Sequence, residues 1–309
     1  MPLLAINHHY FRVFSTGRGI HPTTPQMLAD EVLKIRAAGW RIGCEEDIIA
    51  FLSGQLEAND PVVILTFDDG LAEQMAVLEQ LDAMGASAIF FVPTAPIMEC
   101  FVLDVHKLQM IRSRVDDADI AIELGKAFAF STMEFDDDLL ATQYRYDDIL
   151  GRRVKYFLNF MLNEDVKLDW MTKYFNTLFG DEQEVAASLY MSRDDLCRLS
   201  DKRMLGSHAH SHLPLATLKP EQVLHELTYS RKLIEEITTN PPGGLSYPFG
   251  GKSAVSQAVF DDAASCGYAY GFTMERGIND LPESVKAMAL RRIDINDLDN
   301  WLYISKQYI

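Results

Sequence analysis

The fold is decided by residues 62–70, which read Val-Val-Ile-Leu-Thr-Phe-Asp-Asp-Gly. Their first six residues are mostly apolar and β-branched, which is typical of a strand buried on both faces of a parallel sheet. Two carboxylates and a glycine follow directly, at the carboxyl end of this predicted strand. Because α/β folds place their chemistry at that end of the strands, we expect a functional site beside Asp68 and Asp69.

Short apolar runs alternate with amphipathic stretches on both sides of this strand, as in βα units around a mostly parallel sheet. The predicted strands also include residues 3–7, 40–43, 88–92, 204–207, 245–247 and 268–273. The predicted helices include residues 45–52, 71–84, 192–199, 220–238 and 253–265. We therefore expect an α/β protein.

The alternation breaks after Pro93. Residues 100–190 are rich in aromatic and acidic side chains, with apolar positions at helical spacing, and are too apolar for a linker. We expect a helical insertion over residues 100–190, and a (β/α) body built from residues 1–99 and 191–309.

Composition excludes several kinds of partner. The 309 residues are 48% hydrophobic, which is enough for a large core, and 28 Lys and Arg against 45 Asp and Glu give a formal charge of −17. A polyanion such as a nucleic acid, or an anionic membrane surface, would be repelled by this charge. No apolar run approaches the roughly 20 residues that cross a bilayer, so we expect no membrane span.

The cysteines indicate the compartment. Four of them are scattered without a CxxC pair, at positions 44, 100, 197 and 266. This is unlike a secreted disulfide scaffold and is typical of reduced thiols. The N-terminus has no basic region and reaches two histidines early, so we expect no signal peptide and a cytoplasmic location.

Adjacent carboxylates at Asp68 and Asp69 repel each other, and holding both at a strand end calls for a metal ion or a raised pKa on one of them. The alternative is that they cap the helix that starts near Leu71. The motif alone does not decide between these two roles.

A histidine cluster offers the ligands that such a metal would need. Residues 206–212 read Gly-Ser-His-Ala-His-Ser-His. His208 and His212 are four residues apart, so on one helical turn they would share a face and converge on one cation, while His210 would point elsewhere. A carboxylate from another strand end would complete an open zinc site.

A third element is the loop Tyr247-Pro248-Phe249-Gly250 after a short predicted strand. It could form an apolar wall beside a sugar ring and offer a backbone N–H to an oxyanion. Taken alone, the loop is better explained as an ordinary turn.

In this order the three elements resemble the polysaccharide deacetylase family of metal-dependent carbohydrate esterases, which fold as a distorted, incomplete (β/α) barrel. The resemblance covers residues from about 5 to 93 and from about 192 to 297, and leaves the insertion outside. Residues 291–294, Arg-Arg-Ile-Asp, resemble the C-terminal strand of a bacterial subset associated with surface-glycan biosynthesis.

The resemblance implies a role for each motif. Asp69, His208 and His212 would hold a divalent metal, with zinc expected, and Asp68 would be the general base that activates water. Residues 247–249 would contact the substrate, with the N–H of Phe249 as an oxyanion donor. The implied activity is removal of an N-acetyl group from an amino sugar or glycan intermediate.

One departure from the family concerns an arginine. Many members carry one at the position of Ser246, where it pairs with the base aspartate. Arg292 could replace it by reaching the site from a C-terminal strand; the alternative is a surface or capping arginine.

A second departure concerns the general acid. Many members use a C-terminal histidine, and this chain has no histidine after His225. The candidates are His8 and His9 at the end of the first strand and His106 in the insertion, and we favour His9. Without any of them, Asp68 once protonated would deliver the proton, or a metal-bound water would.

Two further functions stay open beside deacetylation. One is hydrolysis of another small amide or a cyclic imide on the same fold, and the other is glycan binding without turnover. An intact Asp68 argues against the second. For the insertion we expect a cap over one rim of the barrel, limiting substrates to small or chain-end sugars.

Overall fold

The computed structural model describes residues 2–13, 20–56, 60–280 and 286–305. The chain divides into two compact units, and each is considered by itself. The first comprises Met1–Phe14, Pro22–Glu99 and Ser188–Ile309, and the second Ser15–His21 and Cys100–Ala187.

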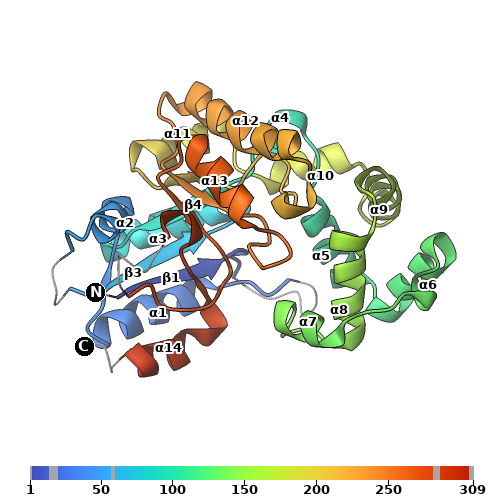
Figure 1. The fold of residues 1–309 in the computed structure, drawn as a ribbon, viewed down its shortest axis with the longest axis horizontal. Helices are drawn as coiled ribbons and strands as arrows, with labels where there is room; N and C mark the ends of the chain where they lie inside the picture. Colours follow the sequence, from blue (N-terminus) through green and yellow to red (C-terminus); the bar gives the residue numbers. More distant parts are fainter. Residues whose placement is uncertain (1, 14–19, 57–59, 281–285, 306–309) are drawn as a thin grey trace. The chain divides into compact units, whose positions relative to one another are not determined.

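The first unit is built on one parallel sheet (Figure 1). Its strands are β1 (Leu3–His8), β2 (Arg41–Ile42), β3 (Val62–Phe67), β4 (Ala88–Val92), β5 (Leu205–Ser207), β6 (Gly244–Ser246), β7 (Tyr270–Phe272) and β8 (Ile293–Asp294). Their order is β7-β6-β5-β4-β3-β1-β8, and β2 pairs with β3. The sheet curls into an incomplete (β/α) barrel, in which Phe272 of β7 forms a single parallel bridge to Leu290, just before β8. The expected fold class is confirmed.

Both faces of the central strands are buried, as the apolar run at residues 62–67 predicts. Successive residues of β1 and β3 enter two different hydrophobic clusters, with Leu4 and Leu65 in one and Leu3 and Ile64 in the other. This alternation follows from the two-residue period of a strand. A rigid, fully covered sheet therefore carries the residues at its carboxyl edge.

Helices cover the sheet of the first unit. They are α1 (Pro25–Ala37), α2 (Glu45–Leu52), α3 (Met75–Met84), α4 (Ala95–Glu99), α11 (Arg193–Asp201), α12 (Pro220–Thr238), α13 (Gln257–Ser265) and α14 (Leu298–Ser305). The predicted bounds of α2 and α12 agree with the structure. Helix α13 begins four residues later than predicted, because the side chain of Ser256 caps it by accepting a hydrogen bond from the N–H of Val259.

The chain after Asp68 and Asp69 also differs from prediction. A continuous helix was expected from Leu71, but Leu71 forms a bridge with Tyr190, and a short 3₁₀ turn over Ala72–Gln74 precedes α3. The side chain of Gln74 donates hydrogen bonds to the carbonyl oxygens of His9 and Asp68. Neither carboxylate therefore caps a helix, since Leu71 is the N-cap of the 3₁₀ turn and Gln74 that of α3.

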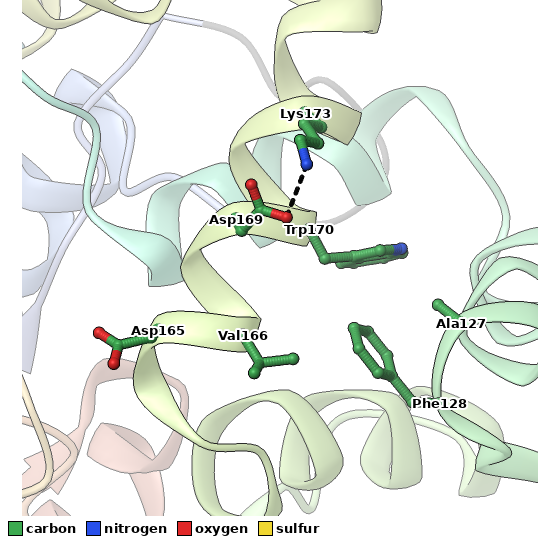
Figure 2. A pocket seen from close by; sticks show the side chains of 7 residues that line it. All are labelled: Ala127, Phe128, Asp165, Val166, Asp169, Trp170 and Lys173. Carbon is green, nitrogen blue, oxygen red and sulfur yellow. Dashed lines mark hydrogen bonds and ion pairs between the residues drawn. The ribbon is translucent and has the colours of Figure 1, made fainter.

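The described part of the second unit is formed by helices. They are α5 (Asp104–Arg114), α6 (Asp117–Phe128), α7 (Asp137–Gln143), α8 (Ile149–Tyr156), which continues into a π-helical turn over Phe157–Met161, α9 (Glu164–Phe179) and the start of α10 (Glu182–Leu189). A shallow surface pocket of about 440 Å³ lies between α6 and α9, where the rings of Phe128 and Trp170 meet edge to face (Figure 2).

No helix among the described residues has the length and apolar character that crossing a bilayer requires.

Candidate active site

The carboxyl edge of the sheet gathers polar residues from distant parts of the chain. Asp68 and Asp69 follow β3, His208 follows β5 and Ser246 ends β6. Arg292 directly precedes β8, and its long side chain runs along the strands to the same edge. Parallel strands bring these residues together because all their carboxyl ends lie on one side of the sheet.

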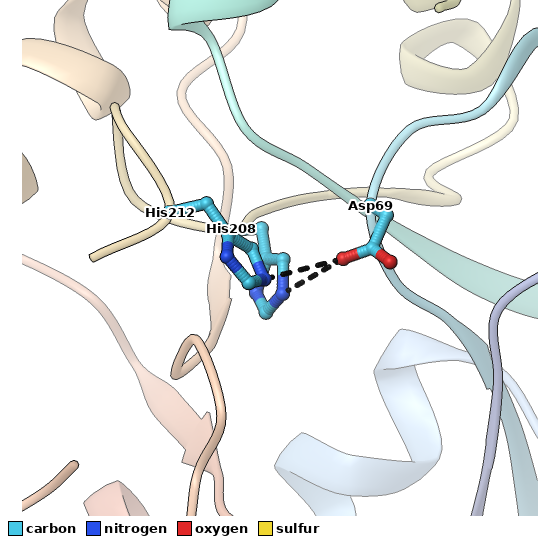
Figure 3. Close-up of side chains that lie close together, drawn as sticks. All are labelled: Asp69, His208 and His212. Carbon is cyan, nitrogen blue, oxygen red and sulfur yellow. Dashed lines mark ion pairs between the residues drawn. The ribbon is translucent and has the colours of Figure 1, made fainter. Parts of the chain in front are cut away.

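Asp69, His208 and His212 form one group (Figure 3). Oδ1 of Asp69 lies 3.4 Å from Nε2 of His208 and 3.3 Å from Nε2 of His212. One ligand atom from each residue falls within 4.8 Å of the others, and all three side chains are buried. The spacing is therefore that of ligands around a single ion.

The donor set fits a divalent cation such as zinc. In a tetrahedron with metal–ligand distances of about 2.0–2.1 Å, neighbouring ligands lie about 3.3–3.4 Å apart, which matches the two observed distances. Nδ1 of His208 lies 2.7 Å from the carbonyl oxygen of Ser246. A carbonyl only accepts, so Nδ1 carries the hydrogen and Nε2 offers its lone pair toward Asp69 and His212.

The expectation that His208 and His212 share a helical turn is wrong. Residues 208–214 form a loop, in which Ala209 and His212 have left-handed backbone angles, with φ of 60° and 57°. A right-handed helical turn cannot contain such residues. The loop nevertheless brings the two imidazoles together, with ring centroids 4.8 Å apart.

Unfavourable backbone angles concentrate at this site. Asp69 has φ of 80° and Phe249 has φ of 61°, in addition to Ala209 and His212. Residues other than glycine rarely adopt these angles, and they persist only where the surrounding structure imposes them. Their gathering around one group of potential ligands supports a functional role for it.

Asp68 is held by a buried arginine. Nη1 and Nη2 of Arg292 donate to Oδ1 and Oδ2 of Asp68 over 3.0 and 2.8 Å, and Arg292 is fully buried. Ser246 Oγ donates to Oδ2 over 3.0 Å and accepts from Nη2 over 2.9 Å. The surface or capping role considered for Arg292 is thereby excluded.

The other hydrogen bonds of the Arg292 guanidinium are to β1, to β3 and to the residue after β7. Nη1 also donates to Oδ1 of Asn7 and Oγ1 of Thr66, and Nε donates to the carbonyl oxygen of Thr273. Every nitrogen of this buried cation is satisfied, which its burial requires. Arg292 is thus fixed in position before any substrate arrives.

The same contacts set the protonation of Asp68. Burial raises the pKa of its carboxyl group, but the charge of Arg292, followed by His208, the Arg292 hydrogen bonds and His9, outweighs burial and holds the pKa below its usual value. Asp68 is therefore ionised at neutral pH and able to accept a proton.

The three residues of the aromatic loop differ in burial and in their neighbours. The half-exposed ring of Phe249 lies 5.1 Å from the ring of His212. Tyr247 is buried in the hydrophobic cluster with Val259 and packs against Phe260, and Pro248 is buried as well. Of the three predicted contacts, Phe249 is the one that the structure brings beside the histidines.

The three histidines considered as general acids lie in different surroundings. His8 is buried and uses both ring nitrogens, Nε2 toward Glu31 at 2.9 Å and Nδ1 toward the carbonyl oxygen of Thr66 at 3.1 Å. His9 is half-buried and close enough for its charge to act on Asp68. His106 is buried in α5 of the second unit.

Sequence reasoning missed two residues that hold Arg292, namely Asn7 and Thr66. They pair directly across β1 and β3, so they share a face, and Thr66 shares that face with Asp68 because strands repeat every two residues. A polar residue at the corresponding place in each of two apolar strands was the available signal.

Tyr10 was missed as well: burial and then the charge of Asp69 raise the pKa of its phenol well above normal.

Comparisons with known proteins agree with this geometry. Residues 146–271 match the family model described as polysaccharide deacetylase. The match contains His208, His212 and the 247–249 loop, whereas Asp68 and Arg292 lie outside it and join the site through the fold. Comparison with curated proteins found no match.

Solved structures share the architecture over nearly the whole chain. The Streptococcus pyogenes deacetylase PplD in complex with acetate has a TM-score of 0.56 at 17% identity, covering 98% of this chain and 97% of that one. A de-N-acetylase from Aggregatibacter actinomycetemcomitans has a TM-score of 0.61 at 12% identity, covering 97% and 100%. IcaB from Ammonifex degensii has a TM-score of 0.58 at 11% identity, covering 98% of both chains. At these identities the likeness establishes the fold.

Proposed function

We propose that the chain is a member of the polysaccharide deacetylase family and a hydrolase of carbon–nitrogen bonds, and that it removes the N-acetyl group of an amino sugar, as a free glycan or a glycan intermediate. The observation that carries the proposal is the placement of an ionised, arginine-held Asp68 directly beside Asp69, His208 and His212. A base next to a three-ligand open site is the arrangement that hydrolysis with activated water requires.

Asp69, His208 and His212 would hold a divalent metal, and we propose zinc. When bound, the cation lowers the pKa of a water molecule and polarises a carbonyl group. Phe249 lies against His212, where its ring would contact the sugar and its backbone N–H would face the developing oxyanion.

Asp68 would act as the general base through Oδ1. Oδ2 already accepts from Arg292 and Ser246, whereas Oδ1 accepts from Arg292 alone and keeps one lone pair. In the proposed reaction Oδ1 takes a proton from water, the water oxygen bonds to the acetyl carbon, and the carbon–nitrogen bond then breaks. The leaving nitrogen must gain a proton to depart as an amine.

His9 is our proposed source of that proton. It is half-buried, and it belongs to the same group of charges as Asp68. His8 is a poorer candidate, because both of its ring nitrogens already have partners. If His9 does not serve, Asp68 would return the proton that it took.

Acetate is the second product of the proposed reaction, and PplD, with the same fold, binds acetate in its solved structure. This agreement supports an acetyl-bearing substrate.

The test measures acetate released from soluble N-acetylhexosamine oligosaccharides by metal-free protein, with and without added zinc. We expect release that depends on zinc, is abolished by a chelator and is lost in the His208→Ala variant. A matched control is His21→Ala, which removes an exposed histidine.

Other results of this test would favour a different hydrolase or a glycan-binding protein. Cleavage of small amides or cyclic imides without cleavage of N-acetyl sugars would contradict deacetylation and favour the second kind of hydrolase. Glycan binding without any cleavage, unchanged in Asp68→Asn, would indicate a binding protein. The cytoplasmic location stays a prediction, which fractionation of expressing cells would test.

A further inference from the structure

The loop that carries His208 and His212 has a strained backbone conformation. Three residues, Ala209, His210 and Ser211, must turn the chain so that both imidazoles meet Asp69. The left-handed angles of Ala209 and His212 show that this turn is not a relaxed one. Something outside the loop must hold it in this conformation.

Glu226 of α12 contacts the middle of the loop. Its Oε2 accepts hydrogen bonds from the backbone N–H of His210 at 2.9 Å and of Ser211 at 2.7 Å. Glu226 is only 5% exposed. Hydrogen bonds to a carboxylate are stronger than those between neutral groups, and burial strengthens them further. One oxygen thus fixes two successive peptide groups between the two histidines.

The helix that carries Glu226 is firmly packed. Glu226 lies within the 19-residue α12, and its neighbours Val223 and Leu227 belong to the same hydrophobic cluster as Ala209. The carboxylate therefore does not follow the loop if the loop moves.

His210 gives the loop further contacts. Its Nε2 lies 3.2 Å from Oε1 of Glu99, and its Nδ1 lies 2.8 Å from Oγ1 of Thr94. Its carbonyl oxygen accepts from the N–H of Ala95 at 2.9 Å. The middle histidine thus anchors the loop to the chain after β4 and to α4, and its ring also packs against Tyr229 of α12, with ring centroids 4.7 Å apart.

We propose that Glu226 is the positioning residue of the metal centre: by holding the peptide groups of His210 and Ser211, it sets the separation and orientation of His208 and His212. The inference rests on the proposed function for the existence of that centre. It assigns Glu226 no contact with metal or substrate.

The test compares Glu226→Gln with Glu235→Gln, the same change at an exposed position of the same helix. Each protein is freed of metal and titrated with zinc against a chromophoric competitor. The absorption spectrum of the cobalt(II) form is then recorded, because its d–d bands report the ligand geometry directly. The thermal midpoint of the metal-free protein measures folding separately.

Groups that orient metal ligands typically change metal affinity about 10–100-fold when removed. We expect Glu226→Gln to weaken zinc binding about 10-fold and to shift the cobalt bands, with the metal-free protein still folded, and Glu235→Gln to match the parent in all three measurements. An unchanged zinc affinity and cobalt spectrum in Glu226→Gln would overturn the proposal.

A second variant covers the case in which Glu226→Gln does not fold. Glu226→Asp keeps the charge but withdraws it by one methylene, so we expect a smaller loss of zinc affinity together with shifted cobalt bands; parental values would again overturn the role of Glu226. If the unaltered protein binds neither zinc nor cobalt, the failure belongs to the proposed metal centre instead.

Discussion

Each of the two units buries a cluster of charges, and the two clusters differ in what they leave open. In the first unit Arg292 pairs with Asp68, a residue 224 positions away in the chain. In the second, Lys107 is fully buried among Glu182 at 2.9 Å, Thr172 at 2.8 Å and Asp104 at 3.7 Å.

The Lys107 cluster is closed, in that each of its carboxylates pairs with a cation: Glu182 with Lys107, and Asp104 with Lys167 at 2.9 Å. The ammonium of Lys107 donates to Glu182 and Thr172, and Glu182 also accepts from the N–H of Val102. At Asp68, by contrast, one carboxylate oxygen keeps a lone pair, and Asp69 and two imidazoles lie alongside. Buried charge alone does not mark an active site; a buried charge with unused capacity beside a ligand set does.

The largest expected effect on kcat comes from removing the free lone pair of Asp68. In Asp68→Asn the lone pair that would accept the proton of water is lost, and general base catalysis typically contributes about 10²–10⁴-fold. We expect kcat for acetate release to fall by about this factor, while the zinc affinity stays within a few-fold of the parent. Asp201→Asn, at the exposed end of α11, is the matched control. Parental activity in Asp68→Asn would remove Asp68 from the mechanism.

Removing the cation from either cluster should destabilise the protein. Arg292→Met leaves the Asp68 carboxylate buried and unpaired, at a cost of about 3–5 kcal/mol in the free energy of unfolding. Because Asp68 also loses its orientation, kcat of the folded fraction should fall as well. Urea unfolding and acetate release measure the two effects.

Lys107→Met sharpens the comparison, because it breaks the closed cluster. We expect a similar loss of stability, about 3–5 kcal/mol, from the unpaired carboxylate of Glu182. In contrast to Arg292→Met, acetate release per folded molecule should stay at the parental value. A fall in kcat as large as that in Arg292→Met would contradict the distinction between the two clusters.

A third buried pair, His8 with Glu31, should act on stability in a pH-dependent way. Burial lowers the pKa of His8, but the charge and hydrogen bond of Glu31, with smaller contributions from the Thr66 carbonyl and Asp294, outweigh burial and raise it. The stabilisation is therefore complete below the unfolded pKa of about 6.5 and is lost as the pH rises through the folded pKa.

The variant His8→Gln tests this dependence. A hydrogen bond to a charged group contributes about 1.5–3 kcal/mol, so the parent should exceed the variant by up to that amount in acid and by less in alkali. Urea unfolding at several pH values measures the difference. A gap that widens with rising pH would refute the assignment.

The smallest effect is expected at Ser246. Ser246→Ala removes one of three hydrogen bonds to Asp68 and leaves the Arg292 pair in place. We expect a loss of about 1 kcal/mol in transition-state stabilisation, equal to about a 5-fold lower kcat/KM. Loss as large as that in Arg292→Met would mean that the hydroxyl, rather than the guanidinium, holds the base.

Local patterns were the predictable part of this molecule. The bounds of β3, β4, α2 and α12 follow from apolar runs and capping residues, which act within a few positions of the chain. The turn between His208 and His212 was not predictable from the helical period, because contacts with Glu226 and Thr94 impose a loop there. Nor was the burial of Tyr247, since it depends on what packs behind β6.

By itself the sequence determined the strand that ends in Asp68 and Asp69, the pair of histidines, and the fold to which their order belongs. These features depend on residues that are close together in the chain. Only the tertiary structure decided that Arg292 reaches Asp68 while Ser246 bridges them, because strands far apart in the chain become neighbours only when the sheet forms. Register and packing across the sheet, which no local pattern encodes, bring the base, its arginine and the ligand set to one edge.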